Sequence, residues 1–211
     1  MSGAAAVVEA LLQRAGRGGR RWSRSDYETD ATTLAQRLLG RTLVRIDPET
    51  GERLSGVIVE TEAYLGVEDK AAHSVGGRRT ARNEPMYGPA GTLYVYFTYG
   101  MHHCANIVAG AEGEPVAVLL RAIEPVEGIE RMRTRRLALR RGRSSSVRVR
   151  DLCSGPAKLC QALALDRSLS GASLLDPACP VWVEEGGSPP AACVVRAPRI
   201  GVEYAQEWAD K

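Results

Sequence analysis

The sequence predicts a mixed, mostly antiparallel α+β domain, and two observations carry this prediction. Helix patterns and short strand patterns are interspersed along the 211 residues without the regular strand–helix alternation of a Rossmann-type sheet. The composition, 44% hydrophobic and 25% charged, is that of a soluble globular protein. It excludes a disordered chain and a collagen-like repeat, and no apolar run approaches the ~18 residues of a membrane helix.

The first half of the chain is expected to supply one helix and most of the strands. Asp30 can cap a helix in which Leu34 and Leu38 share a face and which stops at Gly40. A turn over residues 48–51 predicts a hairpin between the first two strands. The strands are predicted from alternating or β-branched residues at 42–47, 54–60, 92–99, 104–109 and 116–122.

The second half is expected to hold shorter elements. Pro125 can open a helix that continues to Arg140, and Ser154 can cap a helix over residues 156–165. Short strands are predicted at residues 181–184 and 193–197, and a last helical turn or two at residues 203–209. Residues 65–91 are rich in glycine and proline and are expected to form a long loop.

The domain is expected to cover residues 30–211, preceded by a flexible basic tail over residues 1–29. That tail is rich in arginine, glycine and serine and poor in acidic residues. The five cysteines form no CxxC pair, which favours a reducing compartment over a disulfide framework.

Residues 131–150 contain nine arginines and no acidic residue. A block of one sign is poorly suited to pairing within itself, and two interpretations stay open. It can be a solvated helix face, or a mobile basic arm that touches nucleic acid.

Two segments carry residues suited to chemistry. On a strand, Glu60 and Glu62 lie on one face, so they are either two solvent-facing carboxylates or a candidate general base. Tyr94 and Tyr96 likewise share a face, as a core edge or as a platform on which bases stack. Tyr99, beside Gly100, is expected to protrude from the end of its strand.

The three histidines raise the question of a metal site. His73, His102 and His103 match no standard zinc-finger spacing. Adjacent histidines on a strand also point to opposite faces. We therefore expect no metal.

Several motifs together resemble the alkyladenine (3-methyladenine) DNA glycosylase family. They lie, in the family's order and spacing, at residues 59–66, 71–74, 80–83, 91–106, 118–125 and 153–163. Long motifs in order are far more specific than any one pattern. The resemblance implies a single compact domain around a curved antiparallel sheet with surrounding helices, and no cofactor.

The implied activity is that of a monofunctional glycosylase in base-excision repair. Such an enzyme extrudes an alkylated or deaminated purine from the duplex and hydrolyses its bond to the sugar, leaving an abasic site. The implied substrates are 3-methyladenine, 7-methylguanine, hypoxanthine and ethenoadenine.

The resemblance also assigns roles to residues of this sequence. It makes Glu62 the general base, with Arg121 and the backbone carbonyl of Ile200 at the water site. The implied base pocket consists of Tyr64, Ala72, His73, Tyr96, Asn106 and Leu119. The implied intercalation and DNA contacts come from Tyr99, Met101, His102, Arg78 and Arg82.

The implied partner is damaged double-stranded DNA, with no membrane. We expect a monomer whose abasic product passes to downstream processing enzymes. It would work inside the cell with the DNA, in the nucleus of a eukaryote or the cytoplasm and nucleoid of a prokaryote, with a mitochondrial pool as an alternative.

Three departures from the family pattern leave alternatives open. His102 and His103 replace a bulkier aromatic pair, and residues 109–115 form a slightly longer segment. Family members usually continue with another strand after the point where this sequence stops, at Lys211. One alternative is therefore a catalytically weakened DNA-binding member of the same fold. The others are an arginine-rich RNA-binding protein and a zinc hydrolase.

Overall fold

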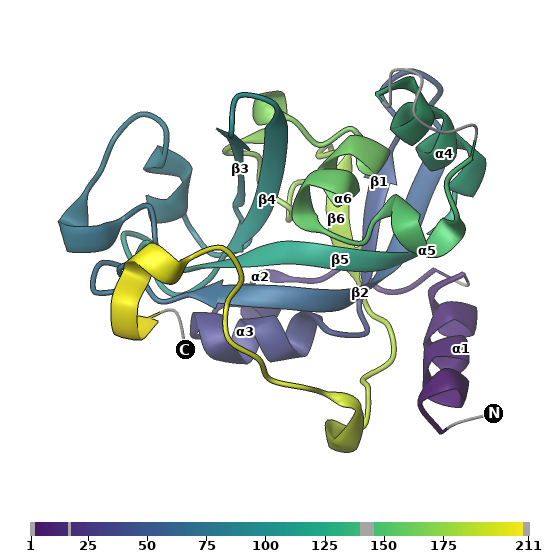
Figure 1. Cartoon of the computed structure of the whole chain (residues 1–211), viewed down its shortest axis with the longest axis horizontal. Coiled ribbons are helices and arrows are strands. Elements are labelled where there is room, and N and C mark those ends of the chain that lie inside the picture. The colour runs from purple at the N-terminus through teal and green to yellow at the C-terminus, as the bar shows by residue number, and fades with distance from the viewer. Residues whose placement is uncertain (1–2, 17, 140–145, 209–211) are drawn as a thin grey trace.

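The computed structural model describes residues 3–16, 18–139 and 146–208. Within them the chain forms one curled sheet whose strand order is β3-β4-β5-β2-β1-β6, with every neighbouring pair antiparallel (Figure 1). The strands are β1 (Thr42–Ile46), β2 (Arg53–Tyr64), β3 (Leu93–Thr98), β4 (His102–Val108), β5 (Ala117–Glu127) and β6 (Val181–Glu184). This confirms the predicted single α+β domain.

Helices surround the sheet. They are α1 (Gly3–Ala15), α2 (Arg24–Tyr27), α3 (Ala31–Leu38), α4 (Ile129–Ala138), α5 (Val149–Leu152) and α6 (Pro156–Leu163). Short 3₁₀ turns lie at Val75–Gly77, Glu84–Tyr87, Arg167–Leu169, Ala191–Cys193 and Glu203–Trp208. The predicted cap of α3 is confirmed, because the Asp30 carboxylate accepts a 2.8 Å hydrogen bond from the Thr33 N–H. No described helix has both the length and the apolar character that a membrane span requires.

The long β2–β5 pair bends where β2 carries an irregularity around Glu60. A bulge leaves one residue without a partner in the ladder, which kinks the strand and re-aims the side chains beyond it. Beyond this point Glu62 lies opposite Leu119 of β5. The bulge therefore sets the direction of the strand end that carries the candidate base.

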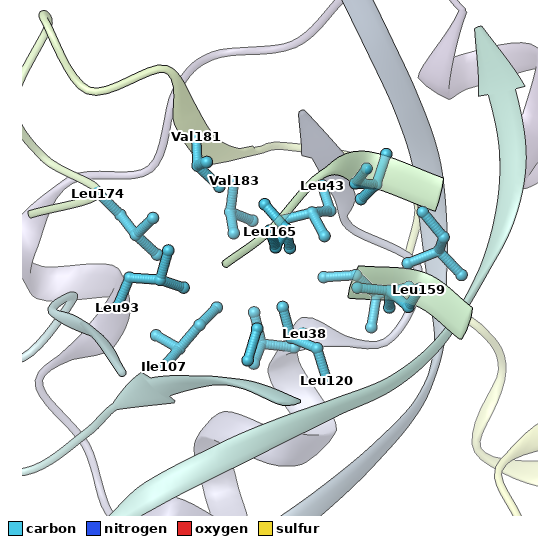
Figure 2. Close-up of a cluster of buried hydrophobic side chains, with 14 of the residues drawn as sticks. Leu38, Leu43, Leu93, Ile107, Leu120, Leu159, Leu165, Leu174, Val181 and Val183 are labelled. Carbon is cyan, nitrogen blue, oxygen red and sulfur yellow. The ribbon is translucent and has the colours of Figure 1, made fainter. Parts of the chain in front are cut away.

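The main core lies on one side of the sheet. Leu93, Ile107 and Leu120 project from β3, β4 and β5 into it and are fully buried. Figure 2 shows them facing Leu159 of α6 and Val183 of β6 across the cluster. The residues that alternate with them in β3, β4 and β5 face the other way, as period-2 strands require.

Two predicted elements differ from the structure. Pro125 belongs to β5, and the following helix α4 begins only at Ile129. Proline has no N–H to donate, yet it is tolerated here because it sits at a register shift of the β2–β5 ladder. Residues 193–197 form no strand, because this segment pairs with no neighbouring strand.

The N-terminal segment also differs from the flexible tail expected over residues 1–29. Residues 3–15 form α1, and Trp22 and Tyr27 are buried in the main core with their rings 5.2 Å apart. The backbone N–H of Trp22 donates a 2.9 Å hydrogen bond to the carbonyl of Val183. Two large aromatic side chains thus anchor this segment beside β6.

The arginine block finds acidic partners on other segments and on its own helices. Arg131 and Arg135 of α4 both form ion pairs with the inaccessible carboxylate of Asp47. Arg133 pairs with Glu130, and Arg148 pairs with Asp151. All of these acidic partners lie outside residues 131–150, so the block does not pair within itself, as expected, but these four arginines are held by neighbouring segments. Residues 140–145 of the block lie outside the described residues.

Candidate active site

The face of the sheet opposite the main core carries a row of polar and aromatic residues. Glu62 of β2 lies opposite Leu119 of β5, which lies opposite Asn106 of β4, which lies opposite Tyr94 of β3. All four are nearly inaccessible. Strand register alone thus brings together residues that are distant in the sequence.

Glu62 is a buried carboxylate held by one arginine. Its Oε2 lies 2.6 Å from Nη1 of Arg121, and Nε of the same guanidinium lies 2.7 Å from Oε1 of Glu60. Oε1 of Glu62 is buried and has no hydrogen-bond partner among the described residues. A buried acceptor without a hydrogen bond lowers the stability of the fold, so a donor that enters the site gains a favourable hydrogen bond to this oxygen.

Aromatic rings line the same face beside this carboxylate. The His73 ring lies 4.5 Å from the Tyr96 ring, edge to face, and its Nδ1 is 2.9 Å from the hydroxyl of Tyr94. Burial lowers the pKa of His73 to about 4, and the charges of Arg82 and Arg78 act in the same direction. The imidazole is therefore neutral at pH 7.

Tyr64 continues the row at the end of β2. Burial raises the pKa of its hydroxyl, and the nearby Glu62 carboxylate raises it further. Burial also raises the pKa of Tyr96. Both phenols are therefore neutral at pH 7, as the His73 ring is.

Small and short side chains complete the predicted pocket. Asn106 donates through Nδ2 to the carbonyl of Tyr94 at 3.1 Å, which fixes its amide orientation. Leu119 and Ala72 are buried as well, with exposed fractions of 3% and 4%. All three side chains are thus almost inaccessible to solvent.

The loop between β2 and β3 brings His73 to the sheet. Asn83, itself buried, donates through its amide to the carbonyls of His73 and Arg78. Arg82 donates to the carbonyl of Phe97 at 3.1 Å, with its guanidinium 5.5 Å from the Tyr96 ring centre. The loop is thereby tied to β3 and covers the aromatic wall.

The β3–β4 hairpin presents Tyr99 to solvent. Tyr99 and Gly100 both have positive φ, 51° and 66°, as at the two central positions of a type I′ turn, and the backbone N–H of Met101 donates to the carbonyl of Thr98. This conformation is uncommon for a residue other than glycine. The side chain of Tyr99 is 82% exposed and that of Met101 66%, so the predicted protrusion is confirmed.

The remaining predicted residues lie outside this row. Arg78 is exposed, and Nδ1 of His102 lies 3.4 Å from Nε2 of Gln161. Ile200 follows Arg199, whose guanidinium lies 5.4 Å from the Tyr64 ring centre. The structure does not bring the three histidines together, and the part of the chain it describes has no group of three His, Cys, Asp or Glu that could hold a metal ion.

The sequence assigned no role to Asn83 or Arg199, and it indicated Tyr94 as a core edge or stacking platform and not as the partner of His73. Tyr94 orients His73, Asn83 fixes the loop that carries it, and Arg199 contacts Tyr64. A buried position for Tyr94 could be read from its strand alternation. The partners of Asn83 and Arg199 come from loops, which have no periodic signal.

Comparison with known proteins adds independent information. The chain matches the methylpurine-DNA glycosylase family over residues 25–210. The human DNA-3-methyladenine glycosylase is 51% identical over 187 residues, 88% of this chain and 61% of the human protein. The mouse protein of that name is 50% identical over 188 residues, 88% of this chain and 55% of its own length.

A bacterial relative is matched over nearly its whole length. The protein of Desulfitobacterium hafniense (strain Y51), provisionally named a 3-methyladenine DNA glycosylase, is 44% identical over 191 residues, 90% of this chain and 92% of its own. By contrast, this chain spans only 55 to 61% of the length of the human and mouse relatives.

Proposed function

The chain belongs to the methylpurine-DNA glycosylase family, and from this premise we propose that it is a DNA repair enzyme that hydrolyses the bond between a damaged purine and its sugar. One observation carries the proposal. Glu62 is a buried carboxylate with one oxygen 2.6 Å from Arg121 and the other unpartnered, directly beside an uncharged aromatic wall. This arrangement suits a base that activates water next to a stacked ring.

In the proposed reaction, Glu62 is the general base. Its free oxygen accepts a proton from a water molecule, whose oxygen forms a bond to C1′ of the sugar. The C1′–N bond breaks, and its electron pair leaves with the base. Arg121 holds the carboxylate in place, and the carbonyl of Ile200 is proposed as a second acceptor for the water. General base catalysis of this kind contributes about 10²–10⁴-fold in rate.

The aromatic wall suits the charge of an alkylated purine. Methylation at N3 of adenine or N7 of guanine makes the base cationic, and a cation over an aromatic face gains about 0.5–2 kcal/mol. Tyr64 and His73 are proposed on one side of the extruded base and Tyr96 on the other. The low pKa of His73 keeps this wall neutral, so it does not repel the cation.

We propose that the substrates also include two uncharged bases, hypoxanthine and ethenoadenine. These neutral bases gain less from the aromatic wall, depend on shape, and must take up a proton to leave as neutral bases. Asn106, buried and fixed by the carbonyl of Tyr94, is proposed to exclude the 2-amino group of normal guanine. Ala72 and Leu119 limit the pocket on its other sides.

When a base leaves the duplex, a protein side chain must fill the space it vacates between the neighbouring bases. We assign this role to Tyr99, because it is exposed at a turn that projects its ring away from the sheet. Met101, His102, Arg78 and Arg82 are the further proposed contacts with the duplex. Unstacking a base costs a few kcal/mol, which such a wedge offsets.

The proposed enzyme cuts no strand. A strand-cleaving lyase uses an amine nucleophile, and the two described lysines bond elsewhere, Lys70 to Glu207 and Lys158 to Ser154. It would act as a monomer on double-stranded DNA and leave an abasic site for other enzymes. Its place in the cell is wherever that DNA lies.

The test is release of free base from a duplex with a single damaged purine. Full-length protein in excess over a 7-methylguanine or hypoxanthine duplex should release the base, detected by chromatography. The strand should break only after alkali treatment, which cleaves abasic sites. Glu52→Gln, an exposed carboxylate just before β2, should behave as wild type. Binding without release would favour the weakened DNA-binding alternative and contradict the proposal.

A further inference from the structure

A buried ion pair lies beside the proposed site and joins two distant segments. Asp69 lies in the loop after β2, and its side chain is inaccessible. Arg199 lies near the C-terminal end, with a side chain only 4% exposed. Nη1 of Arg199 is 2.7 Å from Oδ2 of Asp69, and Nη2 is 3.0 Å from Oδ1. The contact is the two-point arrangement that fixes both position and orientation.

The carboxylate of Asp69 also organises its own loop. It accepts hydrogen bonds of 2.9 Å from the backbone N–H groups of Leu65 and Ala71. Leu65 directly follows Tyr64, and Ala71 directly precedes Ala72 of the proposed pocket. Asp69 thus holds both ends of the loop segment that connects two pocket residues.

The guanidinium of Arg199 connects that loop to β2 and to the C-terminal segment. It donates to the carbonyl of Ala63 at 3.3 Å and to the carbonyl of Trp208. It also lies 5.4 Å from the centre of the Tyr64 ring. Ala63 is the residue after Glu62, so Arg199 is bonded to the backbone one residue from the proposed base. Figure 1 shows the C-terminal segment at the same end of β2.

Ile200 has little else to hold it. Its side chain is 68% exposed, and Gly201, the next residue, has a φ of 78° that favours glycine. Its immediate neighbour Arg199 is the nearest buried anchor, followed by Val202, which is 5% exposed against Ala71. The direction of the Ile200 carbonyl therefore depends on how Arg199 is held.

Stability alone is a weak reason for this ion pair. Removing two charges from water costs about as much as their attraction returns, and apolar residues of similar volume often stabilise a fold equally well. An apolar pair would not, however, fix an orientation through directed hydrogen bonds, of which the two terminal nitrogens of Arg199 donate four. The geometry calls for a role in positioning.

We propose that Arg199 is a positioning residue, which, together with its anchor Asp69, sets the Ile200 carbonyl and the Tyr64 ring relative to Glu62. The inference rests on the proposed function, because it assigns Arg199 to the base-release step. Arg199 acts through these neighbours and does not itself touch the reacting atoms.

The experiment compares Arg199→Gln, Arg199→Lys and Asp69→Asn with a matched control, Arg196→Gln. Arg196 is exposed and lies on the same segment three residues earlier. Two quantities are measured for each protein: the single-turnover rate of hypoxanthine release at saturating enzyme, and the Kd for a duplex in which tetrahydrofuran replaces the damaged nucleotide. Thermal melting reports whether each variant is folded.

We expect Arg199→Gln and Asp69→Asn to slow release at least tenfold while Kd changes less than threefold. Arg199→Lys should recover part of the rate, because an ammonium still pairs with Asp69 but cannot form the two-point contact. Arg196→Gln should leave both quantities unchanged. If Arg199→Gln does not fold, the single-turnover rate of Arg199→Lys tests the inference instead. We then expect that rate to be at least threefold lower than the wild-type rate.

Wild-type rates in the folded variants would overturn the inference. A loss of rate matched by an equal loss of binding, with a lower melting temperature, would also overturn it, since that is a general loss of structure. A wild-type chain that releases no base would contradict the proposed function itself, and the inference with it. An active wild type with equally active variants would contradict the inference alone.

Discussion

The two faces of the sheet formed by β3, β4 and β5 are built by the same strands and differ in almost every property. One face carries Leu93, Ile107 and Leu120, fully buried among other aliphatic side chains. The other carries Tyr94 and Asn106 in one row with Glu62 of β2, all nearly as buried but polar. Burial is therefore similar on the two faces, and what differs is whether the buried atoms are satisfied.

The side chains on the aliphatic face have no polar atoms that need hydrogen-bond partners. Their burial therefore stabilises the fold by about 25 cal/mol per Å² of apolar surface. On the polar face each group needs a partner, and Glu62 retains an oxygen without one. A fold keeps such a group at a cost in stability, and this favours a role in chemistry. The comparison predicts that substitutions on the two faces separate activity from stability.

The largest effect is expected for Glu62→Gln. The amide has nearly the same shape but cannot accept the proton of the water, so base release should slow at least ~10²-fold. Binding to the duplex should stay within threefold. Single-turnover kinetics and binding to a hypoxanthine duplex measure the two quantities. A near-normal rate would remove Glu62 from the proposed mechanism.

The aliphatic face should respond in the opposite way. Leu120→Ala removes a fully buried side chain of β5 and should lower the free energy of unfolding by about 2–5 kcal/mol. Denaturant unfolding measures this loss. At a temperature where the variant stays folded, its rate of base release should change less than threefold. A loss of rate of the size seen for Glu62→Gln would break the separation between the faces.

A smaller effect is expected at the hairpin tip, which belongs to neither face. Tyr99→Ala removes an 82% exposed ring and keeps the Cβ atom at the positive φ, so stability should be unchanged. Extrusion of the base should weaken about tenfold, because nothing fills the vacated stack. Fluorescence of ethenoadenine in a duplex reports extrusion directly. Equal fluorescence for both proteins would exclude Tyr99 from this role.

The smallest effect is expected within the polar face. Asn106→Ser shortens a buried side chain and should admit the 2-amino group of guanine, with a gain for undamaged guanine of less than about tenfold. Release of hypoxanthine should hardly change. Chromatography of bases released from undamaged and hypoxanthine-containing duplexes checks both. An equal loss on both substrates would show that Asn106 is structural.

The sequence was sufficient for the strands that alternate clearly. Residues 181–184 coincide with β6, and the shared face of Tyr94 and Tyr96 follows from period-2 geometry. It was insufficient at Pro125, where a pattern typical of a helix start lies inside β5 because the long partner strand β2 extends that far. Local signals cannot report how far a neighbouring strand reaches.

The candidate site likewise contains features that the sequence predicts and features that only the fold creates. Glu62 was a candidate base from its strand position, but spacing alone favoured a solvent-facing carboxylate, and only the fold buries it. The approach of His73 to Tyr96 depends on a loop of more than twenty residues, tied down by Asn83 and Arg82. No periodicity encodes such contacts. The roles assigned to residues came from the family resemblance.

The arginine block shows the limit of counting charges. Nine arginines without an acidic residue left two interpretations open, a solvated helix face and a mobile basic arm that touches nucleic acid. In the structure Asp47, nearly ninety residues earlier, pairs with both Arg131 and Arg135. Net charge in a window ignores partners that the fold brings from elsewhere.

The most direct test of the separation between the faces is a crossed measurement on two variants. Glu62→Gln and Leu120→Ala are each assayed for single-turnover release of hypoxanthine and for thermal melting. The account predicts that Glu62→Gln loses at least ~10²-fold in rate and melts closer to wild type than Leu120→Ala does, because the amide oxygen still accepts a hydrogen bond from Arg121. Leu120→Ala melts several degrees lower and keeps its rate below that melting temperature. If both variants lose rate and stability together, the two faces do not divide chemistry from folding, and the account is contradicted.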